Sequence, residues 1–73
     1  MIKIRKMFKD LKKQDTVNIL YKDNNIKKDI IEDITSHDGF VSFTLHKTKF
    51  NIKCKSNQAI YHYKDKDVLI FIR

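Results

Sequence analysis

The chain has 73 residues and a formal net charge of +7, with one cysteine, one glycine and no proline. This length predicts a single domain over residues 1–73 with a small core. A lone cysteine excludes an internal disulfide, and no Cys/His spacing indicates structural zinc. No apolar run is long enough to span a bilayer and no signal peptide is recognisable, so we expect a cytoplasmic protein without a membrane partner.

The positive charge is concentrated in two parts of the chain. Residues 1–14 carry +5 and residues 37–73 carry +4, whereas residues 15–36 carry −2. Such a distribution favours a polyanionic partner, which is nucleic acid, an anionic membrane surface or an acidic protein. A merely solubilising surface is the alternative explanation for the same charge.

Residues 3–13 are predicted to form an amphipathic α-helix. Ile4, Met7, Phe8 and Leu11 recur at helical spacing on one stripe, and the lysines lie mainly around the other side. We expect this helix to cover an open end of the fold. Docking to a membrane surface or to a partner is the alternative.

Residues 16–22 alternate between two faces and predict a strand, which the Asx-rich turn 23–25 ends. Residues 26–35 predict a second strand, bent where Ile30 and Ile31 break the alternation. The isoleucines of this segment also fit a helix, so both assignments stay open here. The turn 36–39 follows, and we expect a positive φ at its Gly39.

Residues 40–46 and 49–55 both alternate and predict a β-hairpin. Its apolar face carries Cys54, which we expect to be a small buried hydrophobe, and its polar face carries a row of lysines: Lys49, Lys53 and Lys55. A third turn at 56–58 leads to a short strand at 59–63. After the charged turn 64–66, the apolar strand 68–73 either closes a barrel or pairs with another chain as a homo-oligomer.

These elements predict a mainly β fold. The expected architecture is an N-terminal helix at 3–13 followed by a small, strongly bent antiparallel barrel of five or six strands over 16–73. The alternative is an α+β fold with one antiparallel sheet.

Four stretches resemble the Sm/LSm family, and in particular its bacterial Hfq branch. They are Phe8-Lys9-Asp10, the segment TVNILYKDNNI, Asp38-Gly39-Phe40-Val41 and Ile60-Tyr61-His62-Tyr63. The resemblance implies a ring of subunits that pair through their late strands and bind single-stranded RNA on a ring face. It also implies that Phe40 stacks on a base and that Tyr61, His62 and Tyr63 lie near the pore.

The predicted function is a small basic protein that binds single-stranded RNA or another polyanion, as an Sm/Hfq-like riboregulator. Its candidate nucleic-acid-binding residues are Phe40, Lys49, Lys53, Lys55, Tyr61, His62 and Tyr63. The alternative is a protein-interaction module of phage or mobile-element type that regulates a host protein. No catalytic, metal-binding or cofactor motif is present, so we expect neither an enzyme nor a cofactor.

Overall fold

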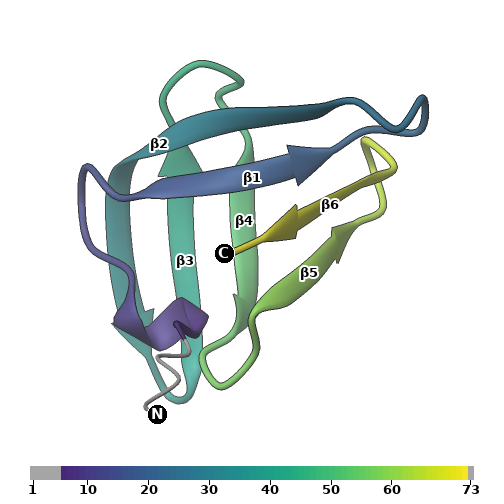
Figure 1. Cartoon of the computed structure of the whole chain (residues 1–73). Coiled ribbons are helices and arrows are strands. Elements are labelled where there is room, and N and C mark those ends of the chain that lie inside the picture. The colour runs from purple at the N-terminus through teal and green to yellow at the C-terminus, as the bar shows by residue number, and fades with distance from the viewer. Residues whose placement is uncertain (1–5, 73) are drawn as a thin grey trace, which may run out of the picture.

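The computed structural model describes residues 6–72, and all of its regular elements are β-strands except one short 3₁₀-helix. The strands are β1 (Thr16–Leu20), β2 (Ile26–His37), β3 (Phe40–Leu45), β4 (Asn51–Lys55), β5 (Ile60–Tyr63) and β6 (Val68–Phe71). All neighbouring strands are antiparallel, in the order β4-β3-β2-β1-β6-β5. The mainly β fold and the small, nearly closed barrel are therefore confirmed (Figure 1).

The long strand β2 joins the two halves of the barrel. Its residues 26–30 pair with β1, whereas residues 31–37 pair with β3, and a β-bulge between Ile31 and Asp33 separates the two ladders. The strand bends at this point and crosses from one layer to the other (Figure 1). The bent strand predicted for 26–35 is confirmed, and the helical alternative is wrong.

The core lies between the two layers. It contains the inward-facing residues of every strand except β5, namely Val17, Ile19, Ile31, Val41, Phe43, Leu45, Ile52, Cys54, Val68 and Ile70. Cys54 is 3% exposed, and burial raises the pKa of its thiol to about 12. This agrees with the expected small buried hydrophobe.

The α-helix predicted for residues 3–13 is wrong within the described residues. Only Phe8–Asp10 form a short 3₁₀-helix, called η1, and both Met7 and Leu11 have extended backbone angles. The backbone N–H groups of Phe8 and Lys9 donate to the carbonyls of Gln58 and Ser56 at 2.8 and 2.9 Å. These tertiary hydrogen bonds replace helical ones in a segment too short to be stable as an isolated helix.

The N-terminal segment nevertheless covers one end of the barrel. Phe8 is fully buried and its ring centroid lies 5.9 Å from that of Phe43, while Leu11 is 7% exposed. Figure 1 shows η1 at the lower end of the barrel, beside the β2–β3 turn. Phe8 and Leu11, two of the four apolar residues that suggested a helix, therefore pack in the core from a different backbone conformation, whereas Ile4 lies outside the described residues.

The turns follow the predicted chemistry. Asp38 and Gly39 connect β2 to β3 with φ of 49° and 80°, the positive values that a two-residue hairpin requires. At the first turn, the Asp23 carboxylate accepts the backbone N–H of Asn25 at 3.1 Å. The positive φ predicted for Gly39 is confirmed.

Strand β6 is paired on both of its edges within the chain, with β1 on one side and β5 on the other. Of the two outcomes predicted for residues 68–73, β6 thus adopts the one that closes the barrel. The outer strands of the sheet are β4 and β5. Pairing of residues 68–73 with another chain stays a prediction.

Candidate nucleic-acid interface

The outer face of β2, β3 and β4 carries most of the candidate site. Alternation along these strands directs every second side chain away from the core, and the registers align these side chains in rows. One row contains Thr35, Ser42 and Lys53, and the next contains His37, Phe40 and Lys55. A third row, toward the bulge, contains Asp33, Thr44 and Asn51. We call these three rows the β2–β3–β4 outer face.

Phe40 is the exposed aromatic residue of this face. It directly follows the Asp38-Gly39 turn, and 40% of its surface is accessible. The Nζ atom of Lys53 lies 5.5 Å from the centroid of the Phe40 ring, and Lys55 stands opposite Phe40 in the strand register. The aromatic ring is thus flanked by two cations on the neighbouring strand.

Two connected surface depressions run along the face. One is lined by Phe40 and Lys53 together with Thr35, His37, Asp38 and Ser42. The second shares Thr35, Ser42 and Lys53 with the first and extends to Thr44 and Asn51. The lining therefore combines an aromatic ring and a lysine with hydroxyl and amide groups that donate and accept hydrogen bonds, and with the carboxylates of Asp33 and Asp38.

The charges of Lys53 and Lys55 are not neutralised by a nearby carboxylate. Within residues 6–72, neither ammonium group lies within ion-pair distance of an acidic side chain. The acidic residues on or beside this face have other partners: Asp33 pairs with Lys13 at 3.8 Å, and Asp38 with His37 at 2.9 Å. Both lysines are thus available to an anionic ligand.

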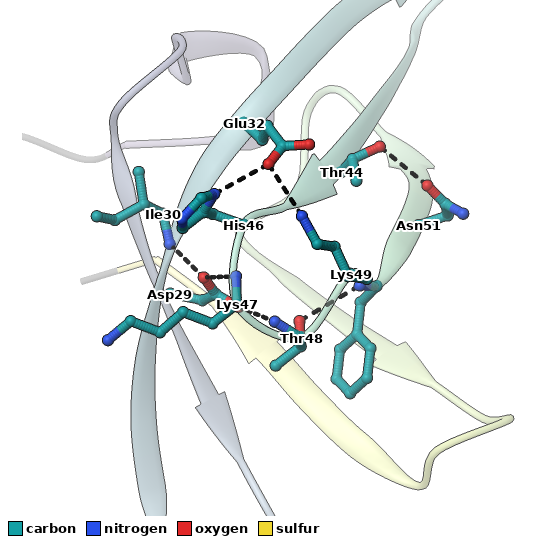
Figure 2. Close-up of polar contacts among 10 residues, drawn as sticks. Asp29, Ile30, Glu32, Thr44, His46, Lys47, Thr48, Lys49 and Asn51 are labelled. Carbon is teal, nitrogen blue, oxygen red and sulfur yellow. Dashed lines mark hydrogen bonds and ion pairs between the residues drawn. The ribbon is translucent and has the colours of Figure 1, made fainter.

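Lys49 is not part of the same row. Strand β4 begins only at Asn51, and Lys49 takes a positive φ of 62° in the preceding loop. Its Nζ lies 3.2 Å from Oε1 of Glu32, and Nδ1 of His46 lies 2.9 Å from the same oxygen. These contacts hold the pKa of Glu32 below its ordinary value of 4.5, and Figure 2 shows them together.

The loop that carries Lys49 is fixed by the buried carboxylate of Asp29. Its two oxygens accept the backbone N–H groups of Lys47 and Thr48, each at 2.9 Å, and Oδ1 also accepts that of Ile30 at 2.7 Å (Figure 2). Burial raises the pKa of this carboxyl, but the three backbone hydrogen bonds outweigh that effect and lower it below 3.8. Asp29 thereby holds the backbone of the loop that precedes β4.

The remaining predicted site residues lie on β5, at the other end of the strand order. Tyr61 and Tyr63 are half-buried and pack against the core. The Tyr63 ring makes an edge contact with Phe50 at 5.2 Å, and the Tyr61 ring lies 6.4 Å from Tyr63. The structure therefore places the two tyrosines toward the barrel interior and does not group them with Phe40.

His62 points to the opposite side of β5 from the two tyrosines. Its Nε2 lies 3.3 Å from Oδ1 of Asp67, and Lys22 binds the other oxygen of Asp67 at 3.0 Å. This group connects the β1–β2 turn to the β5–β6 turn. The structure brings together Phe40, Lys53 and Lys55, but neither Lys49 nor the β5 residues join them.

A second aromatic–lysine pair was not predicted from the sequence. The Nζ atom of Lys27 lies 5.5 Å from the centroid of the Tyr21 ring, across the β1–β2 turn. Both residues line a depression together with Lys22, Asp23, Asn25 and Lys66. The hairpin turn brings Tyr21 and Lys27 together, and Lys66 comes from the β5–β6 turn, so the sequence spacing gives only part of this cluster.

The other lysines are distributed over several parts of the surface. Lys12 and Lys13 lie in the N-terminal segment, Lys28 on β2 and Lys64 in the β5–β6 turn. Among residues 6–72, the β2–β3–β4 outer face therefore differs from the rest of the surface in having two lysines without an acidic partner next to an exposed aromatic ring, and not in gathering all positive charge.

Within residues 6–72, no three His, Cys, Asp or Glu side chains gather closely enough to hold a metal ion. The same residues include no helix with the length and apolar character needed to cross a membrane. No protein-family model, curated protein or solved structure matches this chain.

Proposed function

We propose that the chain binds single-stranded nucleic acid, and RNA in particular, on the β2–β3–β4 outer face. The observation that carries the proposal is the exposed Phe40 ring with Lys53 against it and Lys55 opposite it. An exposed ring offers a stacking surface for a base, and adjacent lysines offer charge to the phosphates on either side of that base.

The neutral groups of the same face suit unpaired bases. The hydroxyls of Thr35 and Ser42 lie in the depression next to Phe40, where they can donate to or accept from a base edge. In a duplex these base edges are paired and the base faces are stacked. The proposal therefore favours single strands over double-stranded RNA.

An Sm/Hfq-like riboregulator is the finer form of this proposal. Support comes from the meander β1-β2-β3-β4, from the bent β2 and from the position of Phe40 directly after the second turn. The ring assembly implied by that resemblance would need other edges than those of β6, since both are paired within the chain.

A fluorescence-anisotropy titration with a labelled single-stranded RNA tests the proposal. Phe40→Leu keeps an apolar side chain but removes the aromatic face, so we expect about a 5- to 150-fold weaker affinity. Phe40→Tyr keeps the ring and is expected to bind as the wild type does. Equal affinity of all three proteins, or no binding by the wild type at low salt, would contradict the proposal.

A protein-interaction module is the second candidate function. The observation in its favour is the exposed apolar surface on the outer side of β1, β2, β5 and β6, where Ile26 is 50% and Ile60 is 61% exposed. Such a surface is typical of sites that bind another protein. If RNA does not bind, this face becomes the primary candidate.

A further inference from the structure

Among residues 6–72, no strand pairs with the outer edge of β5. Its other edge pairs with β6, and β4 and β5 diverge from the 56–58 turn (Figure 1). The backbone N–H of Ile72 donates to the carbonyl of Ala59 at 3.2 Å, which sets the phase of the β5–β6 ladder. Ala59 and Ile72 are thus a hydrogen-bonded pair, and such pairs alternate with non-hydrogen-bonded ones along an antiparallel ladder. Ile60 and His62 therefore belong to non-hydrogen-bonded pairs, and their N–H and C=O groups point away from β6.

The side chains of β5 do not protect this edge. The strand contains no Lys, Arg, Asp or Glu, and Ile60 is the most exposed large hydrophobic residue within residues 6–72. Charged side chains, lysine above all, are the usual protection of an edge strand against pairing. β4, the other outer strand, has this protection in Lys53 and Lys55, and the carbonyl of Lys55 also accepts the N–H of Gln58.

An apolar surface reaches up to the open edge. Ile60 stands opposite Phe71 in the β5–β6 register, and Leu69, two residues before Phe71, has its side chain on the same outer side. Both of these side chains are half-buried. A strand added to β5 would therefore gain backbone hydrogen bonds together with contacts to apolar side chains.

We propose that two copies of the chain form a dimer by antiparallel pairing of their β5 edges about a two-fold axis at Tyr61. In this register, Ile60 pairs with His62 of the partner subunit, and His62 pairs with Ile60 of the partner subunit. In each β5 strand, the backbone N–H and C=O groups of Ile60 and His62 then form hydrogen bonds with the partner subunit. Lys64 comes opposite Gln58 of the partner subunit, so that no like charges face each other across the axis.

This pairing is self-complementary and ends at two subunits. A pairing of β4 with its own copy would instead bring Lys53 and Lys55 against the same residues of the partner subunit, which is unfavourable. Pairing of β5 with β4 of another copy would not close on itself at a dimer, and would give chains or rings. The observed mass therefore separates the β5–β5 dimer from chains or rings formed by β5 and β4, and the variants at Ile60 and His62 separate it from a β4–β4 dimer.

The experiment is sedimentation equilibrium over a range of protein concentrations, at about 0.5 M salt so that repulsion between the two positive chains is screened. We expect a concentration-dependent rise toward twice the 8.8 kDa of one chain. Ile60→Lys adds a charge near the axis, and His62→Pro removes an outward-directed N–H at an edge where proline is tolerated. Both variants are expected to stay monomeric.

Matched controls separate pairing from folding. Ile26→Lys introduces the same charge at an exposed isoleucine on β2, and His62→Ala keeps the backbone N–H, so both are expected to dimerise like the wild type. Circular dichroism checks that each variant is folded. A wild type that stays monomeric, a larger assembly, or dimers of Ile60→Lys and His62→Pro would overturn the proposal. The mass measured in this experiment does not depend on whether the protein binds RNA, so the two proposals can fail separately.

Discussion

The Nζ atom of Lys53 lies 5.5 Å from the centroid of the Phe40 ring, on an outer face of the barrel where Lys53 has no acidic partner among residues 6–72. The contact orients a cation beside an exposed aromatic ring. A phosphate bound by Lys53 would thus lie next to a base stacked on Phe40.

Replacing Lys53 and Lys55 by alanine should weaken RNA binding and reduce its salt dependence. Each neutralised phosphate contributes a slope of about −0.7 in a plot of log affinity against log salt for single strands. The double variant should therefore lose about 1.4 from the slope. Lys12→Ala with Lys64→Ala removes the same charge elsewhere and is expected to change the slope much less. Equal slopes for the two double variants would exclude a specific role of this face.

Lys49→Ala should affect RNA binding less than Lys53→Ala. The Lys49 ammonium group lies 3.2 Å from the Glu32 carboxylate, so its charge is already compensated. Affinity measured at one low salt concentration is sufficient for this comparison. If Lys49→Ala weakens binding as much as Lys53→Ala, the Glu32 contact does not persist in the complex.

Lys27→Ala tests the second aromatic–lysine pair. If the depression beside Tyr21 also contacts RNA, the variant should bind a long single strand more weakly and a short one unchanged, because only a long strand reaches both sites. Affinities for two RNA lengths provide the measurement. An equal effect of Lys27→Ala on both lengths would contradict two separate contacts on one strand.

Asp29→Asn should destabilise the fold by about 1–3 kcal/mol, because the amide cannot accept the backbone N–H groups with both of its polar atoms. Chemical denaturation measures the change, and Asp65→Asn in an exposed turn is the control, expected to stay within about 0.5 kcal/mol. A wild-type-like stability of Asp29→Asn would show that the hydrogen bonds of the carboxylate contribute little to the free energy of unfolding.

The effect of Asp29 should depend on pH. Its pKa is lower in the folded protein than the value of 3.8 expected when it is unfolded, so the charged form stabilises the fold. This contribution is fully present above about pH 4 and decreases as the pH falls through the lower pKa of the folded state. The stability difference between wild type and Asp29→Asn should narrow over the same range. If the stability difference between the two proteins instead grew as the pH fell, the pKa of Asp29 would not be lowered by folding.

Phe8→Ala should cost about 3–5 kcal/mol of unfolding free energy, since Phe8 is fully buried against Phe43 at the barrel end. Phe40→Ala removes the same atoms from a residue that is 40% exposed, and should cost much less. Urea unfolding of the two variants compares them directly. A loss for Phe8→Ala as small as the one expected for Phe40→Ala would contradict the packing of Phe8 in the core.

Alternation was a sufficient signal for the hairpin of β3 and β4. Val41 and Phe43 face inward and Lys53 faces outward, as the period of two predicts, and the single glycine has the positive φ expected of it. The prediction failed at Lys49 because the loop between the two strands is longer than the pattern suggested. Asp29, which accepts two backbone N–H groups of this loop, is far away in the sequence and is polar although it faces inward.

The N-terminal segment shows why a helical pattern was insufficient. Met7, Phe8 and Leu11 have helical spacing, but Ser56 and Gln58 accept the backbone N–H groups of Lys9 and Phe8. Such contacts with residues far away in the chain cannot be predicted from the local sequence pattern. Tyr61 and Tyr63 share a face because side chains alternate along a strand, but only the pairing of β5 with β6 determines that this face is directed inward.

An NMR titration of the ¹⁵N-labelled protein with single-stranded RNA tests the central claim most directly. We predict that the chemical-shift changes concentrate at the amides of the β2–β3–β4 outer face, around Phe40, Ser42, Lys53 and Lys55. Absence of shift changes at low salt, or changes confined to the outer side of β1, β5 and β6, would contradict it.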